Sequence, residues 1–437
     1  MLELKQYINY NYTMINQPWV TKPHWEASDP KLSLLAQSPV RMPHTQNLAE
    51  SIPLSPPGII IVRGPRQTGK STFLRQYVQQ ALASGLPPEN IGLVEAESLQ
   101  SRQDLLGELQ TFRNGHEGFD LILIDEITSL SSWWLALKIA VDEGTLASSL
   151  VICTGSSAYD LREQADLLPG RRGRRYPVDF ELLPVRYAEV CNHLSLDDYF
   201  LTGGFPWAIN EFLKLNLIPS FVYELYAAWI KGVFIRQRQS MHTLVPLLNY
   251  IVERSGTGLS VANMARDCGI GSNHTAESYL SLLEESYALL VARWSEPGSN
   301  TDAPRKNRKF FSADPFLFHL FSVFGRSPEE AFTTSMARRA SPQIMGKLVE
   351  SLVASELRRC SGQLPLRYFL GRKEIDFIGD EAVEVKYQNN VTMREFEWMS
   401  TVLPKGMRAT VVTKQTRSRS GNLRAVPLAE WLLEDRG

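Results

Sequence analysis

The sequence has few of the features that mark disulfide-rich, zinc-binding or membrane proteins. Its 437 residues include only four cysteines, none in a CxxC pair, so we expect neither a disulfide framework nor a zinc site. No apolar run reaches the about 18 residues that a membrane-spanning helix needs. The first residues also lack the basic-then-apolar pattern of a signal peptide. These absences predict a cytoplasmic protein with no membrane partner.

The chain also lacks an excess of charge of either sign. Its formal net charge is −1, so no overall field attracts it to nucleic acid or to an anionic membrane, and such binding would need local patches. The hydrophobic fraction of 43% and the charged fraction of 21% are those of an ordinary globular protein. The length predicts about three domains.

Strand-length and helix-length patterns alternate in the first half of the chain. Short β-branched runs occupy 59–64, 91–96, 121–126 and 150–155. Near-continuous apolar runs separated by helical segments indicate a parallel sheet covered on both faces, which predicts an α/β fold. A further run at 176–183 alternates between apolar and polar residues and is expected at an edge of the sheet.

The flanking segments have different patterns. Residues 1–57, rich in Pro, Asn and aromatics, are expected to be an irregular lead-in. Helical periodicity follows, with a helix–turn–helix pattern at 259–291 and a polar loop or wing at 298–309. The last segment reads helix, three strands, helix, strand. We therefore predict four parts, at 1–57, 58–190, 191–310 and 311–437.

A complete G-x-x-x-x-G-K-S motif lies between the first apolar run and a helical segment. Its glycines let backbone N–H groups and a helix N-terminus face phosphates. Lys70 would reach the β and γ phosphates, and the Ser71 hydroxyl would ligate magnesium. The motif predicts a site for ATP and Mg²⁺. The residues expected to contact the nucleotide are Gly64, Pro65, Arg66, Gln67, Thr68, Gly69, Lys70, Ser71 and Thr72.

Acidic and hydroxyl residues end the apolar runs at 121–126 and 150–155. Following a P-loop in this order, Asp125 is expected to hold the magnesium ion and Glu126 to polarise the attacking water. Thr154 could sense the γ-phosphate from the neighbouring strand, or a hydroxyl there could cap the following helix. In the basic loop, Arg171 or Arg174 could contact the γ-phosphate, within one chain or from a neighbouring copy; the alternative is a solvated loop.

A second group of chemically active residues lies near the C-terminus. Alternate residues of a strand share a face, so Glu384 and Lys386 project together, and a hairpin would bring Asp376 beside Glu384. Two adjacent carboxylates can bind magnesium, and a nearby lysine can stabilise charge or position water. Glu350 would add a third carboxylate ligand. The alternative is a surface hairpin with solvated charges, or an inherited fold without activity.

The helix–turn–helix pattern has the wrong charge for reading DNA. Its second helix carries Glu277, Glu284 and Glu285 and no Lys or Arg, so the major groove would repel it. This favours a packing or regulatory module. The loop that follows is basic and leaves contact with a nucleic acid backbone open; its cations are Arg305, Lys306, Arg308 and Lys309.

Several motifs together resemble one group of proteins. The elements GPRQTGKST, LILIDEI, CTGSSAYDL, LPGRRGRR with LLPVRYAE, and GGFPWAI come in the order found in AAA+ superfamily ATPases of archaea and bacteria with a C-terminal nuclease-like domain of unknown function. The resemblance covers about 25–390. It implies an AAA+ core, a winged-helix region and a restriction-endonuclease-like domain, whose D…E-x-K motif is similar to the Asp376, Glu384 and Lys386 set.

Two functions follow as hypotheses. The first is an ATPase coupled to a metal-dependent nuclease acting on DNA or RNA. The second is an ATP-driven regulatory switch whose C-terminal domain binds a partner and cuts nothing. A small-molecule kinase fits less well, because the additional domains have no place in it. AAA+ cores often form rings, so the resemblance is also compatible with a homo-oligomer.

Overall fold

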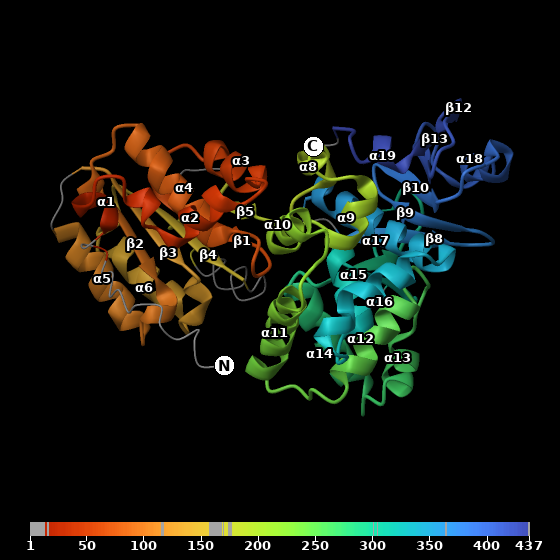
Figure 1. The fold of residues 1–437 in the computed structure, drawn as a ribbon, viewed down its shortest axis with the longest axis horizontal. Helices are drawn as coiled ribbons and strands as arrows, with labels where there is room; N and C mark the ends of the chain where they lie inside the picture. The colour runs from red at the N-terminus through yellow and green to blue at the C-terminus, as the bar shows by residue number, and fades with distance from the viewer. Residues whose placement is uncertain are drawn as a thin grey trace. The chain divides into compact units, whose positions relative to one another are not determined.

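The computed structural model describes residue 14 and residues 17–114, 118–156, 168, 170–173, 177–299, 301–303, 305–362 and 365–435. The chain forms two compact units, Met1–Leu183 and Pro184–Gly437, which are coloured red to yellow and yellow-green to blue in Figure 1. In these described stretches, no helix has the length and apolar character to cross a membrane.

The first unit is built on a parallel five-stranded sheet with the order β2-β3-β4-β1-β5. Three of the four predicted apolar runs are confirmed as the central strands β1, β3 and β4, and the fourth as the edge strand β2. The predicted run at 176–183 supplies the other edge strand, β5. Because β4 lies between β1 and β3, residues at its end adjoin the ends of both. The strands are β1 (Gly58–Arg63), β2 (Ile91–Glu95), β3 (Asp120–Asp125), β4 (Ser149–Gly155) and β5 (Asp179–Glu181).

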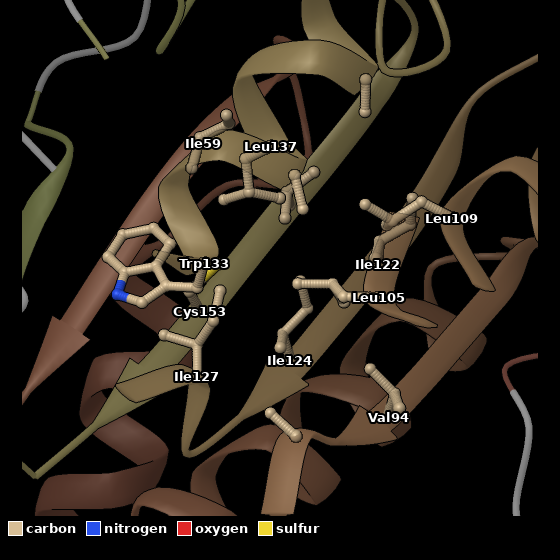
Figure 2. Packing of buried hydrophobic residues seen from close by; sticks show 14 of the residues in the cluster. Ile59, Val94, Leu105, Leu109, Ile122, Ile124, Ile127, Trp133, Leu137 and Cys153 are labelled. Atoms are coloured by element: carbon tan, nitrogen blue, oxygen red, sulfur yellow. The ribbon is translucent and has the colours of Figure 1, made fainter. Parts of the chain in front are cut away.

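Helices cover both faces of this sheet. Successive side chains of a strand point to opposite faces, so Ile61 packs on the side of α5 and α6 while Ile60 packs on the side of α4. Figure 2 shows the first of these faces, where Trp133 of α6 and Leu109 of α5 lie against strand residues. The helices of this unit are α1 (Pro18–Thr21), α2 (Pro30–Gln37), α3 (Pro43–Ser51), α4 (Lys70–Ala83), α5 (Arg102–Asn114) and α6 (Trp133–Asp142), with 3-10 turns η1 (Trp25–Ala27), η2 (Pro88–Asn90), η3 (Ala96–Ser98) and η4 (Ile127–Ser129).

The prediction of an irregular lead-in at 1–57 is wrong for its described part. Three helices form there, and each begins with a proline in its first turn, at Pro18, Pro30 and Pro43. A proline at this position loses no hydrogen bond, because the first N–H groups of a helix have no partner within it. The prolines that suggest breakers in the sequence therefore start helices, and α2 and α3 both pack on α4.

The second unit contains an eight-stranded sheet with the order β12-β13-β11-β10-β9-β8-β6-β7. The predicted series of helix and three strands is confirmed as α17, β8, β9 and β10, and the predicted last helix is reduced to two short turns, η6 and α18. The strands are β6 (Leu289–Trp294), β7 (Arg308–Ser312), β8 (Leu366–Leu370), β9 (Glu374–Ile378), β10 (Glu381–Lys386), β11 (Arg408–Thr413), β12 (Ser418–Ser420) and β13 (Leu423–Pro427).

Helices precede and separate these strands. They include the predicted helix–turn–helix pair α13 and α14, which leads directly into β6. The helices are α8 (Tyr187–Val190), α9 (Leu196–Thr202), α10 (Pro206–Leu215), α11 (Ser220–Arg236), α12 (Leu244–Glu253), α13 (Val261–Asp267), α14 (Asn273–Glu285), α15 (Pro315–Val323), α16 (Ala331–Arg339), α17 (Pro342–Cys360), α18 (Met399–Val402) and α19 (Leu428–Trp431), with η5 (Pro328–Glu330) and η6 (Met393–Phe396).

The predicted boundary at 310/311 falls inside strand β7. The hairpin of β6 and β7 is joined to the C-terminal strands because β6 pairs in parallel with β8. Strands assigned to two different domains thus share one sheet. The breaker-rich segment 298–309 resembles a linker in sequence, yet it contains the β6–β7 connection and the start of β7, so the strand pairing does not separate a middle domain from a C-terminal one.

The GGFP motif makes a tight turn against the start of α15. Gly203 has φ +54°, and a Cβ on it would lie 1.8 Å from Asp314 Oδ1. Asp314 accepts hydrogen bonds from the backbone N–H of Gly204 and of Phe316, both at 2.8 Å. Burial raises the pKa of this carboxyl to about 6. Glycine is required at residue 203 by both its backbone conformation and the space available.

We predict that Gly203→Ala lowers the free energy of unfolding by about 1–3 kcal/mol, because the new methyl group must displace Asp314 from a strained turn. Gly269→Ala is the matched control, since Gly269 also has positive φ (+68°) but nothing within 4 Å of its added Cβ. Thermal melting of the full chain compares them. Equal melting temperatures for the two variants would contradict the packing described at Gly203.

Candidate functional site

The P-loop joins β1 to α4 and is held tightly by its surroundings. A Cβ on Gly64 would lie 2.1 Å from the carbonyl oxygen of Leu182, so only glycine fits there. Gly69 has φ +100° and stands at the N-cap of α4, where no side chain caps the first turn. The first N–H groups of a helix need partners from outside it. This end of α4 therefore offers donors to an anion, as a phosphate requires.

Lys70 is buried inside the loop. Its Nζ donates to the carbonyl oxygens of Gly64 at 3.0 Å and Pro65 at 2.8 Å, and lies 3.6 Å from Glu126 Oε1. Burial lowers the pKa of this amine, against the opposing effect of Glu126 and Asp125. The ammonium group thus has weak carbonyl acceptors that phosphate oxygens could replace.

The two acids at the end of β3 are held by hydroxyl groups of Thr154 in β4 and of Ser156, which follows β4. Asp125 Oδ1 accepts a hydrogen bond from Thr154 Oγ1 at 2.6 Å, and the N–H of Glu126 donates to the same hydroxyl at 3.1 Å. Glu126 Oε2 accepts one from Ser156 Oγ at 3.0 Å. Glu126 has φ +50°, a conformation that is uncommon outside glycine and often found at functional sites. The structure brings the predicted residues Lys70, Asp125, Glu126 and Thr154 together.

The sequence did not identify Arg75 as part of this site. It lies one helical turn after Ser71 and contacts carboxylates from three segments, at Asp29, Glu95 and Asp125. The spacing from Ser71 is a signal that sequence could have given, because residues four apart share a helix face. Its partner Asp29 lies in the lead-in, and no local pattern links the two.

A second contact from the N-terminal helices reaches the P-loop itself. His44 of α3 is buried, and its Nε2 donates to the carbonyl oxygen of Thr68 at 2.7 Å. A Cβ on Gly69 would lie 2.9 Å from the methyl group of Thr45. Helix α3 is therefore part of the wall around the P-loop.

The basic loop does not reach the P-loop within this chain. Arg171 forms an ion pair with Asp142 at 2.7 Å, at the end of α6. The neighbouring Arg172 binds Asp179 and lies beside the first residues of β1, whereas the P-loop follows its last. Contact of Arg171 with a nucleotide bound to the same chain stays a prediction, and the described part of the loop adjoins the end of β1 opposite to the P-loop. Arg174 lies outside the described residues.

Residues 56–191 match a family model described as an AAA domain, and residues 193–329 match a domain of unknown function (DUF8612). Most of the segment that resembles an AAA domain lies in the first unit. An uncharacterized protein of Haemophilus influenzae is 25% identical over 359 residues, covering 75% of this chain and 81% of that protein.

Solved structures give weaker likenesses. A Walker-type ATPase of Pyrococcus abyssi has a TM-score of 0.44 at 15% identity and covers 64% of this chain and 95% of its own. The ORC1 protein of Aeropyrum pernix, solved in complex with DNA, has a TM-score of 0.33 at 12% identity and covers 74% and 98%. At these scores neither structure defines the fold or the function of this chain.

Outside the AAA domain, the second unit holds a buried cluster of charges between α17 and the sheet. Lys309 of β7 is fully buried, and its Nζ lies 2.8 Å from Asp376 Oδ1 and forms a second ion pair with Glu374. The N–H of Asp376 donates to Glu384 Oε2 at 3.3 Å, so the predicted neighbours on β9 and β10 do adjoin. The sequence did not identify Glu374 as part of this cluster, and it placed Lys309 in a basic loop.

The carboxylates of this cluster are poorly solvated. Burial, with repulsion from Asp376, raises the pKa of Glu350 on α17 to about 8 and that of Glu384 well above its ordinary value. Burial lowers the pKa of Lys309, but Asp376 and Glu374 more than offset this and raise it.

The predicted metal ligands Glu350, Asp376 and Glu384 lie in this cluster. Within the part of the chain that the structure describes, no three His, Cys, Asp or Glu side chains are arranged to hold a metal ion. The Lys309 ammonium supplies a positive charge beside Asp376. Metal binding by these three carboxylates therefore stays a prediction, with Lys309 as a competing cation.

We predict that Glu350→Gln stabilises the chain at alkaline pH. The pKa of Glu350 is raised from 4.5 to about 8, so its contribution to stability is full below pH 4.5 and lost as the pH rises through about 8. The melting temperature of the wild type should therefore fall more steeply than that of Glu350→Gln between about pH 5 and pH 8. Glu397→Gln, at an exposed residue, is the control. Parallel pH profiles for wild type and Glu350→Gln would show that the group is not buried as described.

Proposed function

We propose that the AAA domain binds ATP with Mg²⁺ and hydrolyses it. The proposal rests on one observation. Lys70, Asp125, Glu126 and Thr154 lie close together at the carboxyl ends of the strands. These groups come from the ends of β3 and β4 and from the start of α4. A site that joins a cation, two acids and free helix N–H groups suits transfer of a phosphoryl group.

The residues present fit a magnesium-bound nucleotide. Ser71 and Asp125 would hold the metal ion, which supplies charge neutralisation at the phosphates. Lys70 exchanges its carbonyl acceptors for phosphate oxygens. Glu126, held by Ser156, accepts a proton from the attacking water, and Thr154 keeps Asp125 in place. A γ-phosphate contact from Arg171 would come from a neighbouring copy, and so from a homo-oligomer; Arg174 lies outside the described residues and stays a candidate for the same contact.

For the second unit we propose a binding module that ATP hydrolysis regulates. The internal ion pair of Lys309 with Asp376 supports this reading over a metal-dependent nuclease, since a metal ion would compete with a lysine of the protein itself. Glu277 and Glu284 of α14 pair with Arg308 and Arg293 of the β6–β7 hairpin. A helix with these charges is poorly suited to the major groove, and two of the arginines near it are already occupied.

A nuclease remains the second candidate because Asp376 and Glu384 adjoin on neighbouring strands, with Lys386 at the end of the same strand. This arrangement resembles the D…E-x-K motif. A nucleic acid bound by the C-terminal strands would be its substrate, DNA or RNA.

The ATPase proposal predicts two distinct failures. Lys70→Ala should abolish nucleotide binding, because the phosphates lose their buried cation. Glu126→Gln should still bind ATP but turn it over about 100-fold more slowly or worse, as expected for loss of a general base. Fluorescent-nucleotide binding and phosphate release measure the two steps.

Lys138→Ala on α6 is the matched control, since this partly exposed lysine lies outside the site. It should behave as wild type. Normal turnover in Lys70→Ala would refute the P-loop assignment, and normal turnover in Glu126→Gln would give the water-activating role to another residue.

The binding-module proposal predicts no cleavage of single- or double-stranded DNA or RNA with Mg²⁺ or Mn²⁺, whether or not ATP is present. Gel assays with wild type, Lys386→Ala and Lys309→Met test it. Cleavage by the wild type that Lys386→Ala abolishes would replace the binding module with the nuclease.

A further inference from the structure

Arg75 of α4 joins three segments of the first unit through one guanidinium group. Its Nη2 lies 2.7 Å from Glu95 Oε1, its Nη1 lies 3.5 Å from Asp125 Oδ2, and its Nε lies 3.5 Å from Asp29 Oδ2. Nη1 also donates to the carbonyl oxygen of Ser71 at 3.2 Å. Arg75 is 7% exposed, so these contacts replace water around its charge. The guanidinium thus lies beside both proposed magnesium ligands.

The contact with Arg75 completes the positioning of Asp125. Oδ1 of this carboxylate accepts the Thr154 hydroxyl, and Oδ2 faces Arg75. Both oxygens therefore have a partner, and the plane of the carboxylate is set before any cation arrives. Residues that orient a metal ligand in this way change metal affinity or activity by about 10–100-fold when removed.

The charges in this group do not balance. Three carboxylates surround one guanidinium: Asp29 and Asp125 have side chains 11% and 6% exposed, whereas the Glu95 side chain is 58% exposed and largely solvated. An arginine stays charged at any physiological pH and has several donors in a rigid plane, so it can hold three carboxylates at once. A divalent cation at Asp125 would offset the remaining charge.

Asp29 adds a connection to the N-terminal helices. Its Oδ1 caps α2 by accepting the N–H groups of Lys31 and Leu32 at 2.9 and 3.0 Å, while its Oδ2 faces Arg75. One carboxylate therefore fixes both the start of α2 and the guanidinium that holds Asp125. The position of α2 depends on the same group that orients the metal ligand.

We propose that Arg75 is a positioning residue for the magnesium ligand Asp125, and that Asp29 couples helix α2 to it. This inference rests on the proposed binding of ATP with Mg²⁺, but not on hydrolysis. Its measurable consequence lies in how strongly Mg²⁺ tightens nucleotide binding, because Arg75 acts on Asp125 and does not contact the loop that binds the phosphates other than through Ser71.

The experiment measures the affinity of the full chain for a fluorescent ATP analogue in EDTA and across a Mg²⁺ titration. In Arg75→Met, the Mg²⁺ concentration that gives half of the tightening should rise about 10–100-fold, with nucleotide affinity in EDTA changed less than about twofold. Arg75→Lys should recover part of the effect, because it restores the charge without the planar group. Asp29→Asn should give a smaller shift in the same direction.

Arg113→Met is the matched control. Arg113 also forms an ion pair with a buried aspartate of β3, Asp120, but at the opposite end of the strand. This variant should lose thermal stability without a shift in the Mg²⁺ titration.

A Mg²⁺ titration of Arg75→Met that matches wild type, with a melting temperature lowered as in Arg113→Met, would reduce Arg75 to a structural ion pair and overturn the proposal. If Arg75→Met does not fold, an unshifted titration of Arg75→Lys and of Asp29→Asn would overturn it equally. A wild type that binds nucleotide with Mg²⁺ but releases no phosphate would refute the proposed hydrolysis alone and leave this inference standing.

Discussion

Burying Lys70 and Asp125 inside the first unit costs free energy that only opposite charges and hydrogen bonds can offset. The offset comes from a small set of neighbours, with Glu126 and loop carbonyls around the lysine and Thr154 and Arg75 around the aspartate. Much of the first unit serves to bring these partners together at the carboxyl ends of its strands. The strand order matters most, since β4 lies between β1 and β3 and supplies the hydroxyl that both acids share.

The two units neutralise buried acids in different ways. In the first unit, Arg75 pairs with Asp125 beside the P-loop, where Lys70 and the N-terminus of α4 can bind an anion. In the second, Lys309 lies deeper than the carboxylates it pairs with and is fully buried. Lys309 pairs with Asp376 and Glu374, but the raised pKa values of Glu350 and Glu384 indicate that it does not neutralise the whole cluster.

Local features were predictable from sequence and distant contacts were not. The P-loop, the acids Asp125 and Glu126 and the four parallel strands follow from short motifs and apolar runs, each of which fixes its own local structure. The helices that begin at Pro30 and Pro43 were not predicted, because proline is common both in the first turn of a helix and in loops. Asp29 and Lys309 were missed because their partners lie far away in sequence.

The contacts of helices α2 and α3 bear on where the functional unit begins. The matched AAA segment starts at residue 56, yet Asp29 and His44, both N-terminal to it, touch Arg75 and the P-loop. A chain trimmed to the matched segment would expose one side of the P-loop to water. It would also remove the contact between the Arg75 guanidinium and the carboxylate of Asp29. The smallest segment that retains the site as described therefore begins before β1 and includes helices α2 and α3, which begin at Pro30 and Pro43.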